Sequence, residues 1–327
     1  MLSTLARLTQ QTCLKAHRVG AVGARLAFST KETSNAALLS EWVNANSKPI
    51  DFSSLKYETL LLSRRNDSVL HLKLNRPKQL NAFSMQMWVE MADAFKQIER
   101  DPSVKCVVVS GEGKAFTSGM DLNVFGTMQA VMSTDTCEGR KRERLIKVID
   151  NFQKVISAPE NCRVPVIAAI HGPCIGAGVD FITACDLRYC DTSADFSVKE
   201  IDLAIIADIG TLQRLPPLIG EQQAKELSYT GRNVSGLEAE RIGLVLKCLK
   251  DKEELTQYVN NVADNIATKS PITIRGIKQT VHYTRDHSTA DSLHQIRQHN
   301  GAVLNSDDLE RAIAAIMSRS TPTFRND

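Results

Sequence analysis

The sequence predicts an α/β fold that is followed, after about residue 220, by a region made of helices. Short apolar segments with the composition of buried strands occur at 105–110 (KCVVVS), 164–170 (VPVIAAI) and 187–190 (LRYC), and helical segments separate them. Strands that alternate with helices are typical of α/β domains. The later pattern has the period of helices only, in the segments 220–230, 236–242, 251–268, 270–284, 289–303 and 306–319.

The α/β region is expected to open with a hairpin and a helix. Two apolar runs in residues 57–77 flank the polar turn segment 65–68, which is the pattern of a β-hairpin. Ser84 can cap a helix in which four large apolar side chains fall on one face: Trp88, Met91, Phe95 and Ile98.

Composition and charge place the chain among globular proteins. Its 327 residues are 43% hydrophobic and 24% charged, and no run of 18 apolar residues suggests a membrane span. The net charge is +3, but residues 1–28 hold four cations and no acid, so the remaining residues carry about −1. A near-neutral body argues against a nucleic-acid partner.

The first 28 residues have the features of a mitochondrial transit peptide. They contain arginine, serine and threonine, no acid and no continuous apolar stretch. The segment 25–29 (RLAFS) resembles a processing site, so the mature chain is expected to start near Ser29; a disordered tail is the alternative. A loose lead-in is expected over 29–54. The chain ends in FRND rather than in a peroxisomal Ser-Lys-Leu signal, which favours the mitochondrial matrix.

Several familiar sites are excluded by their spacing. Gly111 and Gly113 follow a predicted strand, but the third glycine of a dinucleotide-binding loop is missing, and no G-x-S-x-G motif is present. Cys185, Cys190 and His171 do not have the spacing of a zinc site, so they are interpreted as buried residues. Eight cysteines without regular spacing indicate reduced thiols.

A glycine-rich segment, HGPCIGAGVDFITACD (171–186), has the features of an oxyanion-binding loop. It leaves a predicted strand and opens a helix near Gly176, where the first N–H groups have no partner within the helix. Small residues let a ligand approach these donors closely. Asp180 lies in the same first turn; by itself it also fits an ordinary acid that complements the helix dipole.

The segment VKEIDLAIIADIGTL (198–212) places Glu200, Asp202 and Asp208 among isoleucine, leucine and alanine. Carboxylates in an apolar setting are costly unless they have a role or a partner. One interpretation places Glu200 at a solvated strand edge and Asp208 at a helix N-cap before Ile209. A functional interpretation is that burial raises a carboxyl pKa and keeps one acid protonated near neutrality.

Four segments together resemble the enoyl-CoA hydratase/isomerase family, which has the crotonase fold. They are LNRPKQLNAF (74–83), GKAFTSGMDL (113–122), PVIAAIHGPCIGAGVDFITACDLRYC (165–190) and LPPLIG (215–220), and the resemblance covers about 57–320. It implies a spiral of short strands and helices over 55–220. It also implies a helical oligomerisation region over 221–327, and a homotrimer or homohexamer.

The resemblance also implies a site for a fatty acyl-CoA thioester. Its carbonyl oxygen would bind the backbone N–H groups of Met120 and Ala177, with further substrate contacts from Ser118, Gly119, Asp121 and Leu122. Arg76, Lys78 and Lys114 would meet the coenzyme A phosphates, unless they are simply solvated loop cations. No metal or redox cofactor is implied, since coenzyme A is part of the substrate.

The acids indicate the reaction within this family. Asp180, Glu200 and Asp208 together resemble the Δ3,5-Δ2,4-dienoyl-CoA isomerases, which act in β-oxidation of unsaturated fatty acids, and all three are expected to be catalytic. Asp202 has no family role and is expected on the surface. An enoyl-CoA hydratase, supported by Glu200, and a non-catalytic binding protein of the same fold are the alternatives.

Overall fold

The computed structural model describes residues 35, 37, 39 and 48–326. Pro49–Asp327 forms one compact unit, and the predicted transit peptide lies outside the described residues. The end of the predicted lead-in is not loose, because Phe52, in the short helix η1 (Phe52–Ser54), is buried in the core. The backbone N–H of Ile50 also donates to the buried carboxylate of Asp101.

The central element is a six-stranded sheet with the order β1-β2-β3-β4-β6-β9. Only the first pair is antiparallel, and it is the predicted hairpin. A second sheet has the order β5-β7-β8. The strands are β1 (Leu60–Arg64), β2 (Val69–Leu74), β3 (Cys106–Gly111), β4 (Val166–Ile170), β5 (Pro173–Ile175), β6 (Leu187–Asp191), β7 (Asp195–Ser197), β8 (Val234–Ser235) and β9 (Lys247–Leu249).

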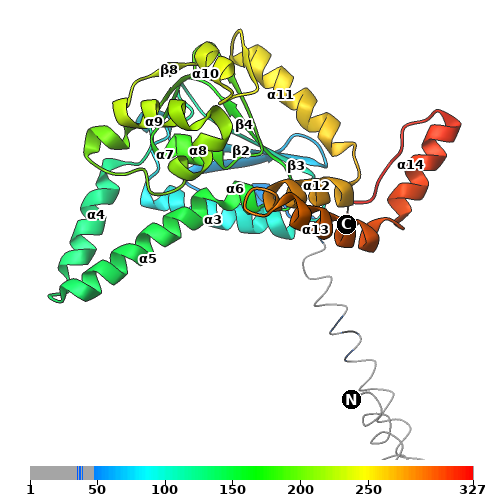
Figure 1. Cartoon of the computed structure of the whole chain (residues 1–327), viewed down its shortest axis with the longest axis horizontal. Helices are drawn as coiled ribbons and strands as arrows, with labels where there is room; N and C mark the ends of the chain where they lie inside the picture. Colours follow the sequence, from blue (N-terminus) through cyan, green and yellow to red (C-terminus); the bar gives the residue numbers. More distant parts are fainter. Residues whose placement is uncertain (1–34, 36, 38, 40–47, 327) are drawn as a thin grey trace, which may run out of the picture. The chain divides into compact units, whose positions relative to one another are not determined.

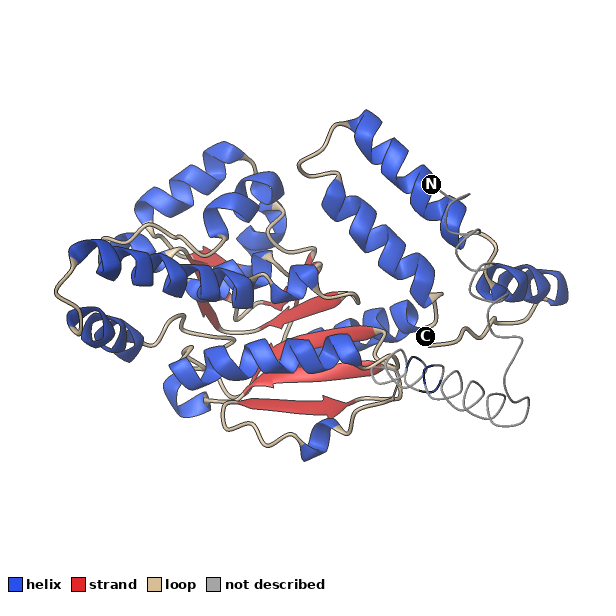
Figure 2. Ribbon diagram, turned by 90° about the horizontal axis from the view of Figure 1, so that it is seen from below, coloured by secondary structure: helices blue, strands red, loops and turns tan. Residues whose placement is uncertain are grey.

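Helices surround these sheets (Figure 1), and Figure 2 shows the strands between them. The α-helices are α3 (Met85–Arg100), α4 (Leu122–Ser133), α5 (Glu138–Ile156), α6 (Ala158–Asn161), α7 (Ala177–Thr183), α8 (Thr211–Ile219), α9 (Glu221–Thr230), α10 (Gly236–Ile242), α11 (Lys252–Ala267), α12 (Pro271–Tyr283), α13 (Thr289–Val303) and α14 (Asp307–Ser318). Two further 3-10 helices are η2 (Pro77–Gln79) and η3 (Lys199–Leu203).

The large sheet is buried on both faces, which explains its continuous apolar strands. Val107 and Val109 of β3 point into one core, where the predicted apolar face of α3 packs. Cys106 and Val108 point into the other core, which α11 covers. The Ser84 hydroxyl accepts a hydrogen bond from the N–H of Met87, as the predicted cap of α3 requires.

The region after residue 220 contains all six predicted helices, but it is not purely helical. Its strands β8 and β9 pair with β7 and β6, so the sheets cross the predicted boundary. Each is only two or three residues long, too short to give a periodic pattern. Helices α4 and α5 were not predicted from the sequence; they form a projecting helical hairpin in Figure 1.

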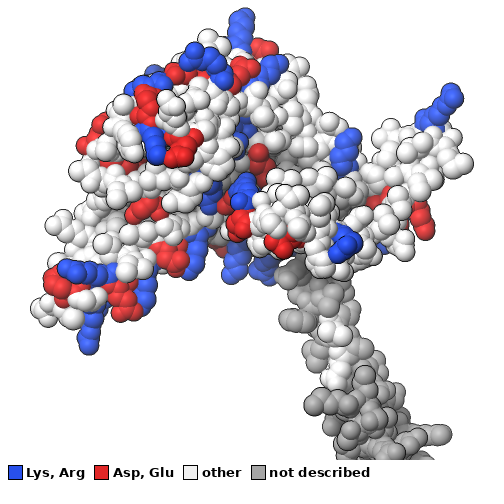
Figure 3. All heavy atoms as spheres, in the orientation of Figure 1, with Lys and Arg blue, Asp and Glu red and all other residues white. Residues whose placement is uncertain are grey.

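Two surface properties bear on the possible partners. No helix in the described part of the chain has both the length and the apolar content that crossing a bilayer needs. On the face drawn in Figure 3, basic and acidic side chains are interspersed rather than gathered into a single basic patch.

Candidate active site

Two loops at the carboxyl ends of β3 and β4 lie against each other. The N–H of Thr117 donates to the carbonyl of Pro173 (3.0 Å), and the N–H of Ile175 donates to the carbonyl of Thr117 (3.1 Å). Gly119 has φ +90°, and a Cβ there would lie 2.7 Å from the carbonyl oxygen of Ile175. The same Cβ position is 3.6 Å from the nitrogen of Ala177, so glycine is needed where the loops meet.

This contact brings the two predicted oxyanion donors, Met120 and Ala177, to one cavity. Within residues 48–326, neither of their N–H groups donates a hydrogen bond. The backbone of Phe83 pairs with the residues on either side of Met120, so the N–H of Met120 stays free. Ala177 is the first residue of α7, so its N–H has no partner within the helix. Both N–H groups can therefore bind an oxygen atom of a ligand.

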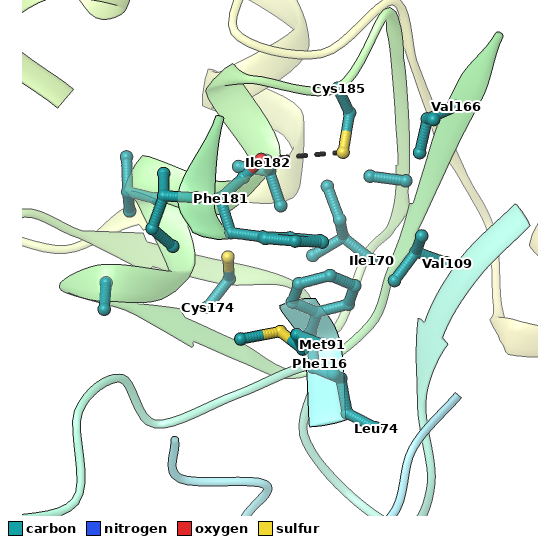
Figure 4. Close-up of a cluster of buried hydrophobic side chains, with 14 of the residues drawn as sticks. Leu74, Met91, Val109, Phe116, Val166, Ile170, Cys174, Phe181, Ile182 and Cys185 are labelled. Carbon is teal, nitrogen blue, oxygen red and sulfur yellow. Dashed lines mark hydrogen bonds between the residues drawn. The ribbon is translucent and has the colours of Figure 1, made fainter. Parts of the chain in front are cut away.

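Packing in the hydrophobic core fixes the position of the short helix α7. Phe181 and Ile182 point into a core cluster that also contains Phe116, Ile170 and Cys174 (Figure 4). The thiol of Cys185 donates to the carbonyl of Phe181 at 3.5 Å. Because these contacts lie directly after Asp180, they fix the position of its carboxylate relative to the loops.

The cavity has a volume of about 1000 Å³, with one polar wall and one apolar wall. The polar wall is formed by the two loops together with Glu200 and Asp208. The apolar wall comes from α4, α5 and the segment before α8; its residues are Phe125, Met128, Leu145, Ile149, Phe152, Ile205 and Ile209. Such a space suits a molecule with a polar end and a hydrocarbon chain.

Asp180 lies behind the cavity wall and is fully buried, with 0% exposure. Its Oδ1 accepts a hydrogen bond from the N–H of Thr211 at 2.5 Å, and its Oδ2 has no partner among the described residues. The pKa of Asp180 is raised to about 6, mainly by burial; hydrogen bonding to Thr211 opposes this rise, and the nearby charge of Asp208 adds to it.

Glu200, on η3, lies directly over the backbone that leads to Ala177. Its Oε1 is 3.1 Å from the position that a Cβ on Gly176 would occupy, and Gly176 has φ +53°. Its Oε2 is buried and has no partner among the described residues. Burial and the charge of Asp180 raise the pKa of Glu200 to about 7. The alternative of a strand edge for Glu200 is wrong, because η3 is a 3-10 helix.

Asp208 lines the same cavity but is the most exposed of the three acids. Its carbonyl accepts a hydrogen bond from the side chain of Gln153 at 2.6 Å, and burial raises its carboxyl pKa above the usual value. It is not an N-cap, because α8 begins at Thr211 and its N-cap is Gly210. The structure therefore brings together the three predicted acids.

The other predicted residues fall into two groups. Ser118, Gly119, Asp121 and Leu122 line the cavity with Met120 and Ala177, as does Arg76. Lys78 and Lys114 are exposed and do not line it. Asp202 is on the surface as predicted, 56% exposed and paired with Lys199 at 3.0 Å.

Arg76 has partners within the described chain. It pairs with Asp121 at 3.0 Å and donates to the carbonyl of Ala82 at 2.5 Å. Lys199, a cavity-lining cation that was not predicted from the sequence, donates to the carbonyl of Gly231 and pairs with Asp202. No cluster of metal-ligating side chains occurs among the residues that the structure describes.

The residues of the apolar wall were not predicted from the sequence either. Leu145, Ile149 and Phe152 of α5 lie three or four residues apart and so share one helix face, which is a detectable signal. That signal identifies a buried face but does not reveal whether a core or a ligand covers it.

Comparisons with known proteins agree with this geometry. A family model described as enoyl-CoA hydratase/isomerase matches residues 64–327. A peroxisomal Δ(3,5)-Δ(2,4)-dienoyl-CoA isomerase from Arabidopsis thaliana is 45% identical over 82% of this chain and 97% of its own. The mitochondrial enzyme of that name from Homo sapiens is 41% identical over 79% of each chain.

Solved structures show the same fold. The crystal structure of an enoyl-CoA hydratase from Bacillus anthracis has a TM-score of 0.75 at 29% identity, covering 83% of this chain and all of its own. A putative enoyl-CoA hydratase from Streptomyces coelicolor A3(2) has a TM-score of 0.76 at 26% identity, covering 84% and 96%. With the family model and the relatives, these matches show that the chain belongs to the enoyl-CoA hydratase/isomerase family and has the crotonase-like α/β fold.

Proposed function

We propose that this protein is a Δ3,5-Δ2,4-dienoyl-CoA isomerase that acts in the oxidation of unsaturated fatty acids. The observation that carries the proposal is the third carboxylate: Asp208 shares one apolar cavity with Glu200 and with the free N–H groups of Met120 and Ala177. Relatives that are 35–45% identical over most of the chain have this activity in their names, which supports the proposal.

In the proposed reaction, the thioester oxygen of a 3,5-dienoyl-CoA accepts hydrogen bonds from the N–H groups of Met120 and Ala177. Ionised Glu200 removes a proton from C2, and the electrons of that C–H bond spread over the conjugated chain as a trienolate. The charge that develops on the oxygen is stabilised by two fixed donors, which favours the transition state over the bound substrate.

The second proton transfer occurs at the far end of the conjugated chain. Protonated Asp208 gives its proton to C6, which restores the carbonyl and leaves double bonds at C2 and C4. An acyl chain in the cavity would shield Asp208 from water, and this desolvation raises its pKa further and favours the protonated form. Two acids at different positions are needed because one carboxylate cannot easily reach both C2 and C6.

Asp180 acts on Glu200 through its charge. It is one of the causes that raise the pKa of Glu200, and a more basic Glu200 removes the C2 proton more readily. The mechanism requires no metal and no cofactor other than the coenzyme A of the substrate.

One absorbance assay tests the proposed function against its rivals. With a 3,5-dienoyl-CoA, an isomerase generates a diene conjugated with the thioester and a new ultraviolet band. With a 2-enoyl-CoA, the rival hydratase, which Glu200 favours, removes the enoyl band. The expected result is a new band with the first substrate and little change with the second; no change with either would favour a binding protein.

The pH dependence of kcat/KM should show an acid limb with a midpoint near pH 7. Glu200 has a raised pKa of about 7, so the protein holds it protonated below that pH and ionised above it. Because only the ionised form accepts the C2 proton, activity rises with pH. Asp180→Asn removes a neighbouring negative charge and should move the midpoint to lower pH. A wild-type midpoint near 4.5 would contradict the role of Glu200.

We also propose a mitochondrial location with removal of residues 1–28. The proposal is supported by the composition of this segment and by mitochondrial relatives from Mus musculus and Homo sapiens, although the Arabidopsis thaliana relative is peroxisomal. Protein isolated from mitochondria should give an N-terminal sequence that starts near Ser29. An intact Met1 in that fraction would contradict the proposal.

We further propose a homotrimer or homohexamer assembled through the C-terminal helices. Large apolar side chains on these helices are exposed in the single chain: Ile277, Val281, Leu293, Ile313, Ile316 and Met317. Exposed apolar groups in such number are typical of interfaces between protein chains.

A further inference from the structure

The segment 204–211, here called the acid loop, positions two of the three carboxylates. It joins η3 to α8, carries Asp208 and ends at Thr211, whose N–H donates to Asp180. Gln153 of α5 holds the loop at one point through the carbonyl of Asp208. A displacement of this loop would therefore move Asp208 and, at the same time, disturb the hydrogen bond from Thr211 to Asp180.

Arg214 holds the acid loop at a second point. Gly210 has φ +143°, and a Cβ there would lie only 2.0 Å from Nη1 of Arg214, so the guanidinium packs directly against the Cα of Gly210. The backbone N–H of Arg214 also donates to the carbonyl of Gly210 at 3.0 Å. The guanidinium of Arg214 therefore packs against Gly210, the residue directly before Thr211.

The guanidinium itself is fixed from the other side by Glu160 and Ser157. Its Nε and Nη2 donate to Oε2 of Glu160 at 3.0 and 2.7 Å, and Nη2 donates to Oγ of Ser157 at 2.7 Å. The side chains of Arg214 and Glu160 are only 15% and 11% exposed, so their ion pair is not a weak surface contact. Arg285, in the turn after α12, donates to the other oxygen of Glu160.

We propose that Arg214, held by Glu160 and Ser157, is a positioning residue that fixes the acid loop so that Thr211 stays on Asp180 and Asp208 faces the cavity. Arg214 does not itself line the cavity. It acts through the loop and through its charge.

The electrostatic surroundings of Asp180 give this role a distinct signature. Asp180 is faced by Glu200 from η3, Asp208 from the acid loop, Cys174 from β5 and Arg214 from α8. Of these four side chains only Arg214 is positive, and it holds the pKa of Asp180 down against burial and Asp208. Loss of the guanidinium charge should therefore shift the titration of Asp180 to higher pH.

The test compares Arg214→Met with Arg214→Lys in the full chain. For Arg214→Met we expect kcat to fall by about 10- to 100-fold at a nearly unchanged KM, and the titration midpoint of Asp180 to move up by about 0.5–1 pH unit. Arg214→Lys keeps the charge but cannot hold Glu160 and Ser157 in the same geometry. It should lower kcat less and leave the titration midpoint of Asp180 near that of the wild type.

Arg64→Met is the matched control for lost stability. Arg64 on β1 is also a partly buried arginine, paired with the buried carboxylate of Asp101, but it lies away from the three acids. It should lower the melting temperature without moving the titration midpoint of Asp180. If Arg214→Met behaves in the same way, with no movement of that midpoint, Arg214 is only structural and the proposal is wrong.

The activity readout rests on the proposed function, so a second readout is needed that does not. Titration of Asp180 can be followed by carboxyl infrared or carbon NMR spectra, with Asp180→Asn identifying its signal. If the wild type fails to isomerise dienoyl-CoA, the proposed function fails, and this titration still decides the role of Arg214. A midpoint that is the same in wild type and Arg214→Met would overturn the inference.

Discussion

Asp208→Asn is expected to abolish isomerisation while exchange of the C2 hydrogens with solvent continues. Asparagine has nearly the same shape and polarity, but it cannot give a proton to C6. The loss of an acid–base group typically costs about 10²–10⁴-fold in rate. Product formation is followed by ultraviolet absorbance, and C2 exchange by mass spectrometry in deuterated water.

Asp202→Asn is the matched control, because Asp202 also lies in the segment 198–212 but is paired with Lys199 on the surface. It should retain both activities. If Asp208→Asn forms the conjugated diene at a nearly wild-type rate, the proposed mechanism is wrong. If both exchange and isomerisation are lost in a folded protein, Asp208 rather than Glu200 is the base at C2.

Ala177→Pro is expected to lower the isomerisation rate by about 10²–10³-fold, the loss typical of one oxyanion donor. Proline removes the N–H that faces the cavity. The first position of a helix otherwise accepts proline well, so α7 should still form. Steady-state kinetics give the rate, and circular dichroism reports whether the fold is retained.

Ala177→Gly provides the comparison, because it keeps the N–H and removes only a methyl group. Its rate should stay close to that of the wild type. Equal damage from the two substitutions would mean that the N–H of Ala177 is not the donor. The loss would then come from altered packing at the start of α7.

Those parts of the fold that leave a local pattern could be predicted from the sequence. The valines of β3 and the Val-Ile-Ala-Ala-Ile run of β4 form continuous apolar segments because both faces of the sheet are covered. The cap at Ser84 and the apolar face of α3 are equally local. These features arise within a few neighbouring residues, so no knowledge of the tertiary structure is needed to detect them.

Features that depend on distant neighbours could not be predicted in this way. Lys78 and Lys114 were predicted to bind the coenzyme A phosphates because they lie on suitable loops; neither lines the cavity, and their contact with phosphate stays a prediction. The contact of Arg214 with Glu160 and Gly210 joins α8 to α6 across the fold. Only the packed structure determines which surface loops and helix faces meet.

The pairing of β9 with β6 has a consequence for how the chain folds. β6 keeps an open edge until residues 247–249 arrive, and much of one face of the sheet stays uncovered until α11 follows. Closing such a long connection is entropically costly, and a parallel pair forms slowly. A chain that emerges N-terminus first from a ribosome therefore exposes the unpaired edge of β6 from the moment residues 187–191 have emerged until residues 247–249 follow. A fragment that ends at residue 220 should aggregate rather than fold, and a chaperone that shields this edge would raise the yield of native protein.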